Sequence, residues 1–71
     1  MKLWICRNTM DLLRAFINKP HSFKAFDDQY GIDYDWSDGN PPVIKFEEDL
    51  FPEVTFENSP QQVEIKLVKE A

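Results

Sequence analysis

A single cysteine, Cys6, limits how this chain of 71 residues can be stabilised. One thiol cannot close a disulfide within the chain, so the cross-links typical of small secreted domains are not possible. A chain of this size buries only about 60% of the surface that it exposes when unfolded. Stability must therefore come from one small hydrophobic core. We expect residues 1–71 to form a single small domain in a reduced, cytoplasmic setting.

The composition supplies enough apolar side chains for such a core. Hydrophobic residues make up 42% of the chain and aromatic residues 14%, which is too rich for a disordered protein. No apolar run approaches the roughly 20 residues of a membrane-spanning helix, and residues 1–7 are too short for a signal peptide. We therefore expect no membrane contact. A binding surface is easier to build in so small a chain than a walled enzyme cleft.

The charge is unevenly distributed along the chain, whose net charge is −5. Residues 1–26 hold five basic and one acidic side chain, a net charge of +4, whereas residues 27–57 hold ten acidic and one basic, a net charge of −9. Binding to a phosphate backbone depends on clustered Lys and Arg, so direct nucleic-acid binding is not expected. The acidic middle either keeps the protein soluble or faces a basic protein partner.

The first strand is predicted at residues 2–6, which are apolar and β-prone. Successive side chains of a strand point to opposite faces, so Leu3 and Ile5 share one face while Trp4 and Cys6 share the other. Apolar side chains on both faces indicate a strand in the middle of a sheet.

Two later segments alternate between apolar and polar residues, as half-buried strands do. They are residues 43–47 and residues 62–68. The core-facing side chains expected in the second of them are Val63, Ile65 and Leu67.

Residues 7–19 allow two interpretations. A helix over residues 9–18 could begin after Asn8 and end before Pro20. Alternatively, a turn near Asn8 could return the chain as a second strand over residues 12–17. Short apolar runs cannot be resolved by periodicity alone.

Residues 20–42 are predicted to be an irregular loop, because Pro and Gly recur along them. Residues 37–40 are Ser, Asp, Gly and Asn, which are typical of turns. Beyond this loop, residues 50–52 form a short apolar turn. Val54 and Phe56 are expected to reach the core from a short extended segment. The prolines of this region are expected at element edges, where a missing amide donor does no harm.

Both ends of the chain carry recognisable motifs: MKLWICR at the start, NKP at 18–20, and LFPEVTFENSPQQVEIKL near the end. In these motifs the chain resembles a group of short uncharacterised proteins of gut bacteria and their phages. Their second strand matches residues 13–16 here, and Met10-Asp11 stands where they carry an Asp-Gly turn. The resemblance implies the hairpin over residues 2–17 and an origin in a mobile element; it implies no activity.

Taken together, the patterns predict a mostly β fold, a small antiparallel sheet of three or four strands with a long aromatic and acidic loop. The alternative is an α+β fold with a helix at 9–18. The expected strands are residues 2–6, 12–17, 43–47 and 62–68.

Residues 33–39 have the one-three-five spacing with which a calcium loop begins, at Asp33, Asp35 and Ser37. The sixth position of such a loop needs Gly and holds Asp38, and the twelfth needs Glu and holds Ile44. An acidic turn whose carboxylates cap backbone amides is the preferred interpretation. No metal and no cofactor are expected.

Catalytic residues are not expected either. Cys6 and His21 are the only pair that could form a nucleophile and its base, and one Cys with one His cannot make a structural zinc site. No Gly-rich phosphate loop is present. The sequence therefore favours a protein that is not an enzyme.

Aromatic side chains interleave with carboxylates in the middle of the chain, and Tyr and Trp often anchor protein interfaces. We therefore expect a binding module, a monomer or weak homo-oligomer, that contacts a basic protein through this segment. The alternative is an assembly protein that self-associates through a sheet edge. Neutralising the aspartates should then leave the fold intact. The candidate contact residues are Tyr30, Asp33, Tyr34, Asp35, Trp36 and Asp38.

Overall fold

The structure, a computed structural model, describes residues 1–29 and 31–66. These residues form six strands and no helix, so they include no helix that could cross a membrane. The predicted mostly β fold is confirmed. The strands, in chain order, are β1 (Lys2–Arg7), β2 (Leu13–Phe16), β3 (His21–Asp27), β4 (Gly31–Ser37), β5 (Ile44–Phe46) and β6 (Gln61–Glu64).

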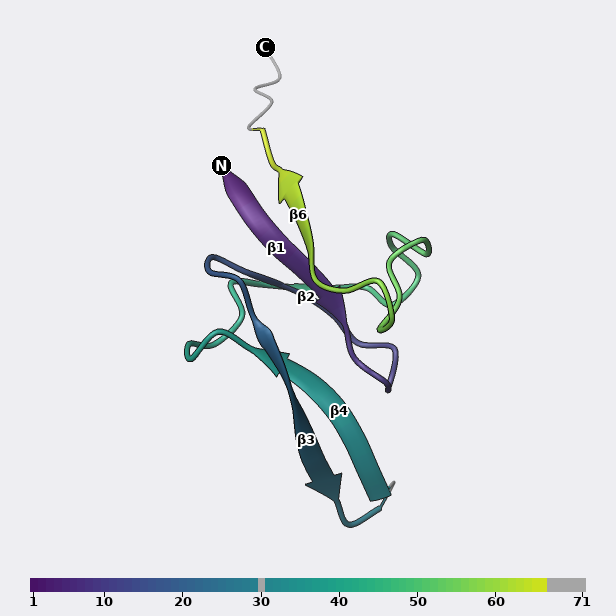
Figure 1. The fold of residues 1–71 in the computed structure, drawn as a ribbon. Helices are drawn as coiled ribbons and strands as arrows, with labels where there is room; N and C mark the ends of the chain where they lie inside the picture. The colour runs from purple at the N-terminus through teal and green to yellow at the C-terminus, as the bar shows by residue number, and fades with distance from the viewer. Residues whose placement is uncertain (30, 67–71) are drawn as a thin grey trace.

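Four of the strands form one antiparallel sheet in the order β5-β2-β1-β6; Figure 1 labels β2, β1 and β6 of this sheet. The register places Ile5 of β1 opposite Ala15 of β2 on one side and Gln61 of β6 on the other. Backbone pairing continues past β6, because the Ile65 amide donates to the Met1 carbonyl. As predicted, β1 is a central strand.

The core lies on one face of this sheet. Its buried side chains, Leu3, Ile5, Leu13 and Ala15, come from the two central strands, and Val54 covers them from a loop. The half-buried side chains that pack against this cluster are Ile44, Phe46 and Val63.

The prediction for the last strand is only partly right. Val63 contacts the core, but Ile65 lies beyond the end of β6 and is 37% exposed, so its assignment to the core was wrong. Leu67 lies outside the described residues.

Residues 2–16 form a β-hairpin, and the helical alternative at 9–18 is wrong. Asn8 explains the choice, because its side-chain oxygen accepts hydrogen bonds from the amides of Met10 and Leu12, both at 2.9 Å, and so closes a tight loop. Asp11 adopts a left-handed conformation with φ 65°, the region that the Gly of an Asp-Gly turn would occupy.

Residues 20–42 were expected to be irregular, and this expectation was wrong. Strands β3 and β4 form a second antiparallel sheet with seven consecutive residue pairs, from His21–Ser37 to Asp27–Gly31. Gly31 has φ +85°, the left-handed conformation that a short hairpin loop requires. The prolines lie before and after the two strands and leave their pairing intact.

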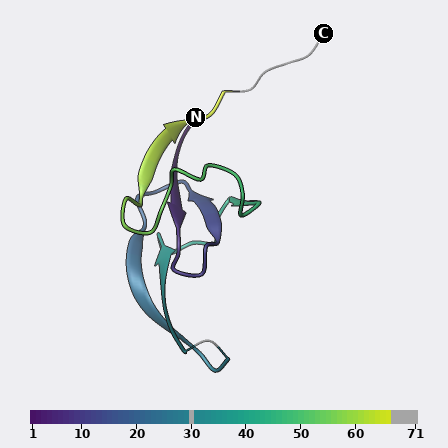
Figure 2. The same ribbon diagram turned by 90° about the vertical axis from the view of Figure 1, so that its right-hand side faces the viewer.

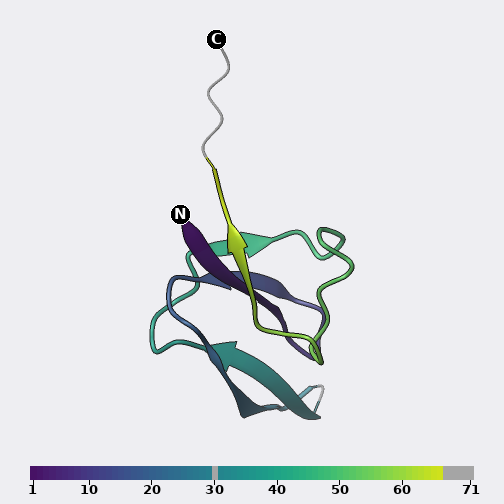
Figure 3. The same cartoon turned by 45° about the horizontal axis from the view of Figure 1, so that its top comes forward.

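The second hairpin is attached to the first sheet through β4. The Thr9 amide donates to the Tyr34 carbonyl at 3.1 Å, the Tyr34 amide donates to the Thr9 hydroxyl at 2.9 Å, and the indole N–H of Trp36 donates to the Arg7 carbonyl at 3.0 Å. The hairpin therefore projects from the end of the sheet opposite the N-terminus, with β4 as the inner strand and β3 as the outer one (Figures 1 and 2). Figure 3 shows the four-stranded sheet above this projecting hairpin.

Candidate functional site

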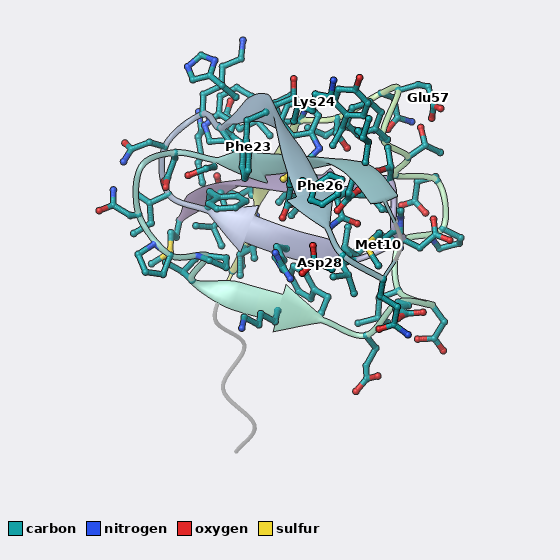
Figure 4. All side chains as sticks on the ribbon, turned by 90° about the horizontal axis from the view of Figure 1, so that it is seen from below. Met10, Phe23, Lys24, Phe26, Asp28 and Glu57 are labelled. Carbon is teal, nitrogen blue, oxygen red and sulfur yellow. The ribbon has the colours of Figure 1, made fainter. Side chains whose placement is uncertain are left out.

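One face of the β3–β4 hairpin carries aromatic and aliphatic side chains. Residues paired across the two strands share a face, so the pairs Ser22–Trp36, Lys24–Tyr34 and Phe26–Ile32 lie together. We call this set of six residues the aromatic face. Phe26 is 77% exposed, Ile32 57% and Tyr34 43%. The hairpin end faces the viewer in Figure 4, where Lys24 and Phe26 are labelled.

The base of the aromatic face is covered by Phe56. The Phe56 ring centroid lies 6.0 Å from that of Tyr34 and 5.6 Å from that of Trp36. Phe56 was expected to reach the main core; instead it is half-buried against the hairpin. Since Trp36 also donates to the Arg7 carbonyl, the base of this face is fixed while Phe26 and Ile32 at its far end remain open.

The carboxylates of Asp33 and Asp35 lie on the opposite face of the hairpin and hold it against the first sheet. Asp33 is buried and accepts a hydrogen bond from the Thr9 hydroxyl. Asp35 accepts from the Asn8 amide group at 3.4 Å and forms an ion pair with Arg14 at 3.4 Å. Along β4 the structure thus separates the aromatic residues from the acidic ones, whereas Phe23 of β3 is paired with Asp35 and lies on the same face as the carboxylates.

The other two candidate residues lie elsewhere. Asp38 follows β4 and caps backbone, since it accepts from the amides of Asn18 and Asn40 at 3.2 and 2.9 Å. Tyr30 lies outside the described residues. No group of three or more potential metal ligands occurs within residues 1–29 and 31–66.

From the sequence we expected that neutralising these aspartates would leave the fold intact. The hydrogen bonds described above lead to the opposite expectation. The triple variant Asp33→Asn, Asp35→Asn, Asp38→Asn should lower the free energy of unfolding by roughly 1–3 kcal/mol, because hydrogen bonds to charged groups are stronger than those to neutral ones. Urea denaturation followed by circular dichroism measures the change.

The matched control removes the same charge from exposed carboxylates, with Asp28→Asn, Glu47→Gln and Glu53→Gln. It should stay within about 0.5 kcal/mol of wild type. Equal stability of the two triple variants would show that the carboxylates of Asp33, Asp35 and Asp38 do not secure the fold.

A buried arginine, which the sequence did not single out, organises the loop over residues 47–55. Arg7 is 7% exposed, and its guanidinium donates five hydrogen bonds of 2.6–3.1 Å to backbone carbonyls. The accepting carbonyls belong to Asp11, Glu48, Leu50, Phe51 and Val54. All five N–H groups of the side chain are satisfied, so Arg7 has a structural role.

An open depression of about 580 Å³ lies beside Arg7 and has an acidic lining. Its carboxylates belong to Asp11, Glu48, Asp49 and Glu57. The described residues place no carboxylate in an ion pair with Arg7, so these nearby negative charges offset a buried positive charge that hydrogen-bonds only to neutral carbonyls.

The structure places Cys6 and His21 on different sheets, Cys6 buried and His21 exposed. Burial raises the pKa of the Cys6 thiol from 9.0 to about 12, and the carboxylate of Asp35 adds to the rise. A thiol with so high a pKa forms almost no thiolate at neutral pH, so it is a poor nucleophile.

Alkylation of Cys6 tests this environment. At about pH 8, iodoacetamide should modify the folded protein at least roughly 100-fold more slowly than the protein in urea. The free energy of unfolding should also fall as pH rises from 9 towards 12, because the unfolded chain loses its thiol proton first. Equal alkylation rates in the two states would contradict the buried position.

Phe26, Ile32 and Lys24 were missed as candidate contact residues because residues 20–42 were read as a loop. The signal that could have found them is the alternation of Ile32, Tyr34 and Trp36 with polar residues.

The chain matches no protein-family model, no curated protein and no solved structure.

Proposed function

We propose that this chain is a non-enzymatic binding module that contacts a basic protein through the aromatic face of its β3–β4 hairpin. The observation that carries the proposal is the exposure of Phe26, Ile32 and Tyr34 together on one projecting element. Small soluble proteins rarely leave neighbouring large apolar side chains open to water unless they contact another molecule. Aromatic side chains are also the usual anchors of protein interfaces.

Charge supports a basic partner. Acidic residues adjoin both ends of the aromatic face in the chain: Asp28 lies in the hairpin loop, and Glu57 directly follows Phe56, which packs against Tyr34 and Trp36; both acidic residues are labelled in Figure 4. The whole chain has a net charge of −5. Such a surface accelerates encounter with a positively charged protein and disfavours acidic ones. Asp33 and Asp35 face the first sheet and so do not line the proposed contact surface. They contribute to binding by stabilising the fold and by adding to the negative electrostatic potential of the chain.

Affinity capture from a lysate of the organism that encodes the chain tests the proposal. The immobilised wild type should retain one basic protein, and the variant Phe26→Ser, Ile32→Ser should lose it. The control variant Ile17→Ser, Val43→Ser removes two exposed apolar side chains outside the hairpin strands and should retain it. Raising the salt concentration should weaken retention.

Retention of the same protein by the Phe26→Ser, Ile32→Ser variant would contradict the proposal, because the aromatic face would then not be the contact surface. Loss in the control variant but not in the hairpin variant would move the contact to the four-stranded sheet.

A further inference from the structure

Lys24 is the only charged residue of the aromatic face, and its charge has the same sign as the basic partner that we propose for that face. It lies opposite Tyr34 in the middle of the face, with one further residue pair of the face on each side. The Lys24 side chain is exposed and forms no ion pair within residues 1–29 and 31–66. The hairpin therefore places a single positive charge at the centre of an otherwise uncharged contact surface.

Protection of the β3 edge does not explain the position of this charge. A lysine on an outer strand discourages pairing with other strands, and Lys24 has that effect on β3. A lysine at position 23 or 25 would protect the edge equally well. It would also lie on the opposite face, across from Asp35 or Asp33, where carboxylates are available to pair with it. A role on the aromatic face itself accounts for the observed position.

A partner that covers the aromatic face also covers Lys24. Phe26 is its neighbour on the same face of β3, and Tyr34 lies directly across the hairpin. The Cβ atoms of such cross-strand pairs are only about 5 Å apart. Removing a charged group from water is costly unless a group of opposite charge replaces the water. A surface that contacts Phe26 and Tyr34 must therefore supply an acceptor for the Lys24 ammonium group.

We propose that the basic partner presents the side-chain carboxylate of one Asp or Glu to Lys24, and that this ion pair determines how the partner is positioned on the aromatic face. The inference rests on the proposed function, because it concerns the same surface. The other, positively charged parts of the partner repel Lys24, so the placement that brings the carboxylate to it is favoured over the others. Phe26 and Ile32 supply contact area, and Lys24 supplies specificity.

A charge reversal at Lys24 tests the proposal, with the basic protein from the capture experiment as the probe, purified and titrated by calorimetry. Lys24→Glu replaces a positive charge with a negative one and so changes the net charge from −5 to −7. Overall charge alone would then strengthen binding to a basic protein. We expect the opposite, a dissociation constant raised by about tenfold or more, because two carboxylates would face each other in the complex.

Lys45→Glu is the matched control. Lys45 is an exposed lysine on β5, outside the aromatic face, and its reversal gives the same net charge of −7. It should lower the dissociation constant or leave it within about twofold of wild type. Circular dichroism should show that both variants are folded, since both side chains are exposed.

A second measurement reverses the pair from the side of the partner. One substitution of Asp or Glu by Lys in the basic protein should weaken its binding to the wild-type chain by about tenfold and restore its binding to the Lys24→Glu variant. The first of these two effects requires no change in Lys24, so it does not depend on how that variant folds.

Equal dissociation constants for Lys24→Glu and Lys45→Glu would overturn the inference. It would also be overturned if no single substitution in the partner had these two effects. Both outcomes leave the contact through the aromatic face intact. Capture of no basic protein, or capture that survives the Phe26→Ser, Ile32→Ser change, would instead remove the proposed function and this inference with it.

Discussion

Replacing Arg7 with methionine should lower the free energy of unfolding by roughly 3–5 kcal/mol, the largest effect that we expect from a single substitution. The guanidinium is buried and supplies five hydrogen bonds to carbonyls from the first hairpin loop and from residues 48–54. Methionine fills similar space but donates none of these bonds. The buried carbonyls would lose their partners, and the loop that brings Val54 into the core would lose its anchor.

The total stability expected for a chain of this length is only about 4–10 kcal/mol, so the Arg7→Met variant should be partly unfolded at room temperature. Urea denaturation gives the change. Arg7→Lys should be nearly as damaging, because an ammonium group cannot reach five separate acceptors. The control is Arg14→Met, which removes a half-buried ion pair with Asp35 and should cost about 1 kcal/mol. A loss below about 1 kcal/mol for Arg7→Met would show that water replaces the guanidinium without cost.

Leu3→Ala should destabilise the protein by roughly 2–5 kcal/mol, because it opens a cavity in the small core. Leu3 is buried on β1 and lies opposite Val63 of β6. Ile65→Ala removes a similar apolar side chain from the same end of the sheet. Ile65 is partly exposed and lies past the end of β6, so this change should cost less than about 1 kcal/mol.

Thermal and urea denaturation of the two variants distinguish two possibilities. In the observed fold β6 ends before Ile65, whereas in the alternative β6 continues and places the Ile65 side chain in the core. Equal losses for Leu3→Ala and Ile65→Ala would contradict the structure and favour a longer β6. Because both substitutions shorten an aliphatic side chain to alanine, the comparison holds the chemistry constant and varies only the burial.

Three strands of the four-stranded sheet were predictable because their signals are local. Alternation or two-faced hydrophobicity marks β1, β5 and β6 in the sequence, and the inward positions Leu3, Ile5 and Val63 follow from it. The choice of hairpin over helix for residues 2–16 was not decided by the pattern. The hairpin depends on the side chain of Asn8, which closes the loop by accepting hydrogen bonds from two backbone amides. It also depends on the left-handed conformation of Asp11.

The second hairpin was missed because proline and glycine were read as signs of irregular structure throughout residues 20–42. In the structure they act only at the boundaries and at the turn, as Gly31 does. Arg7 was missed for another reason. A basic residue at the end of an apolar strand is normally solvated, and the loop that folds over Arg7 supplies four of its five acceptors. No local pattern encodes contacts over more than 40 residues.

The exposure of the aromatic face is a consequence of the same long-range arrangement. Phe56 covers the rings of Tyr34 and Trp36, and nothing within the described residues performs that role at the far end for Phe26 and Ile32. Alternation along β4 already separates Ile32, Tyr34 and Trp36 from Asp33 and Asp35, whereas the register of β3 and β4 was needed to place Phe26 beside Ile32.

Hydrogen–deuterium exchange of the chain with and without the captured basic protein tests the central claim most directly. We predict that binding slows amide exchange in β3 and β4, over residues 21–37, and leaves β5 and the acidic depression beside Arg7 unchanged. Slowed exchange confined to residues 47–57, with the hairpin unaffected, would show that the partner occupies the acidic depression and would contradict a contact through the aromatic face.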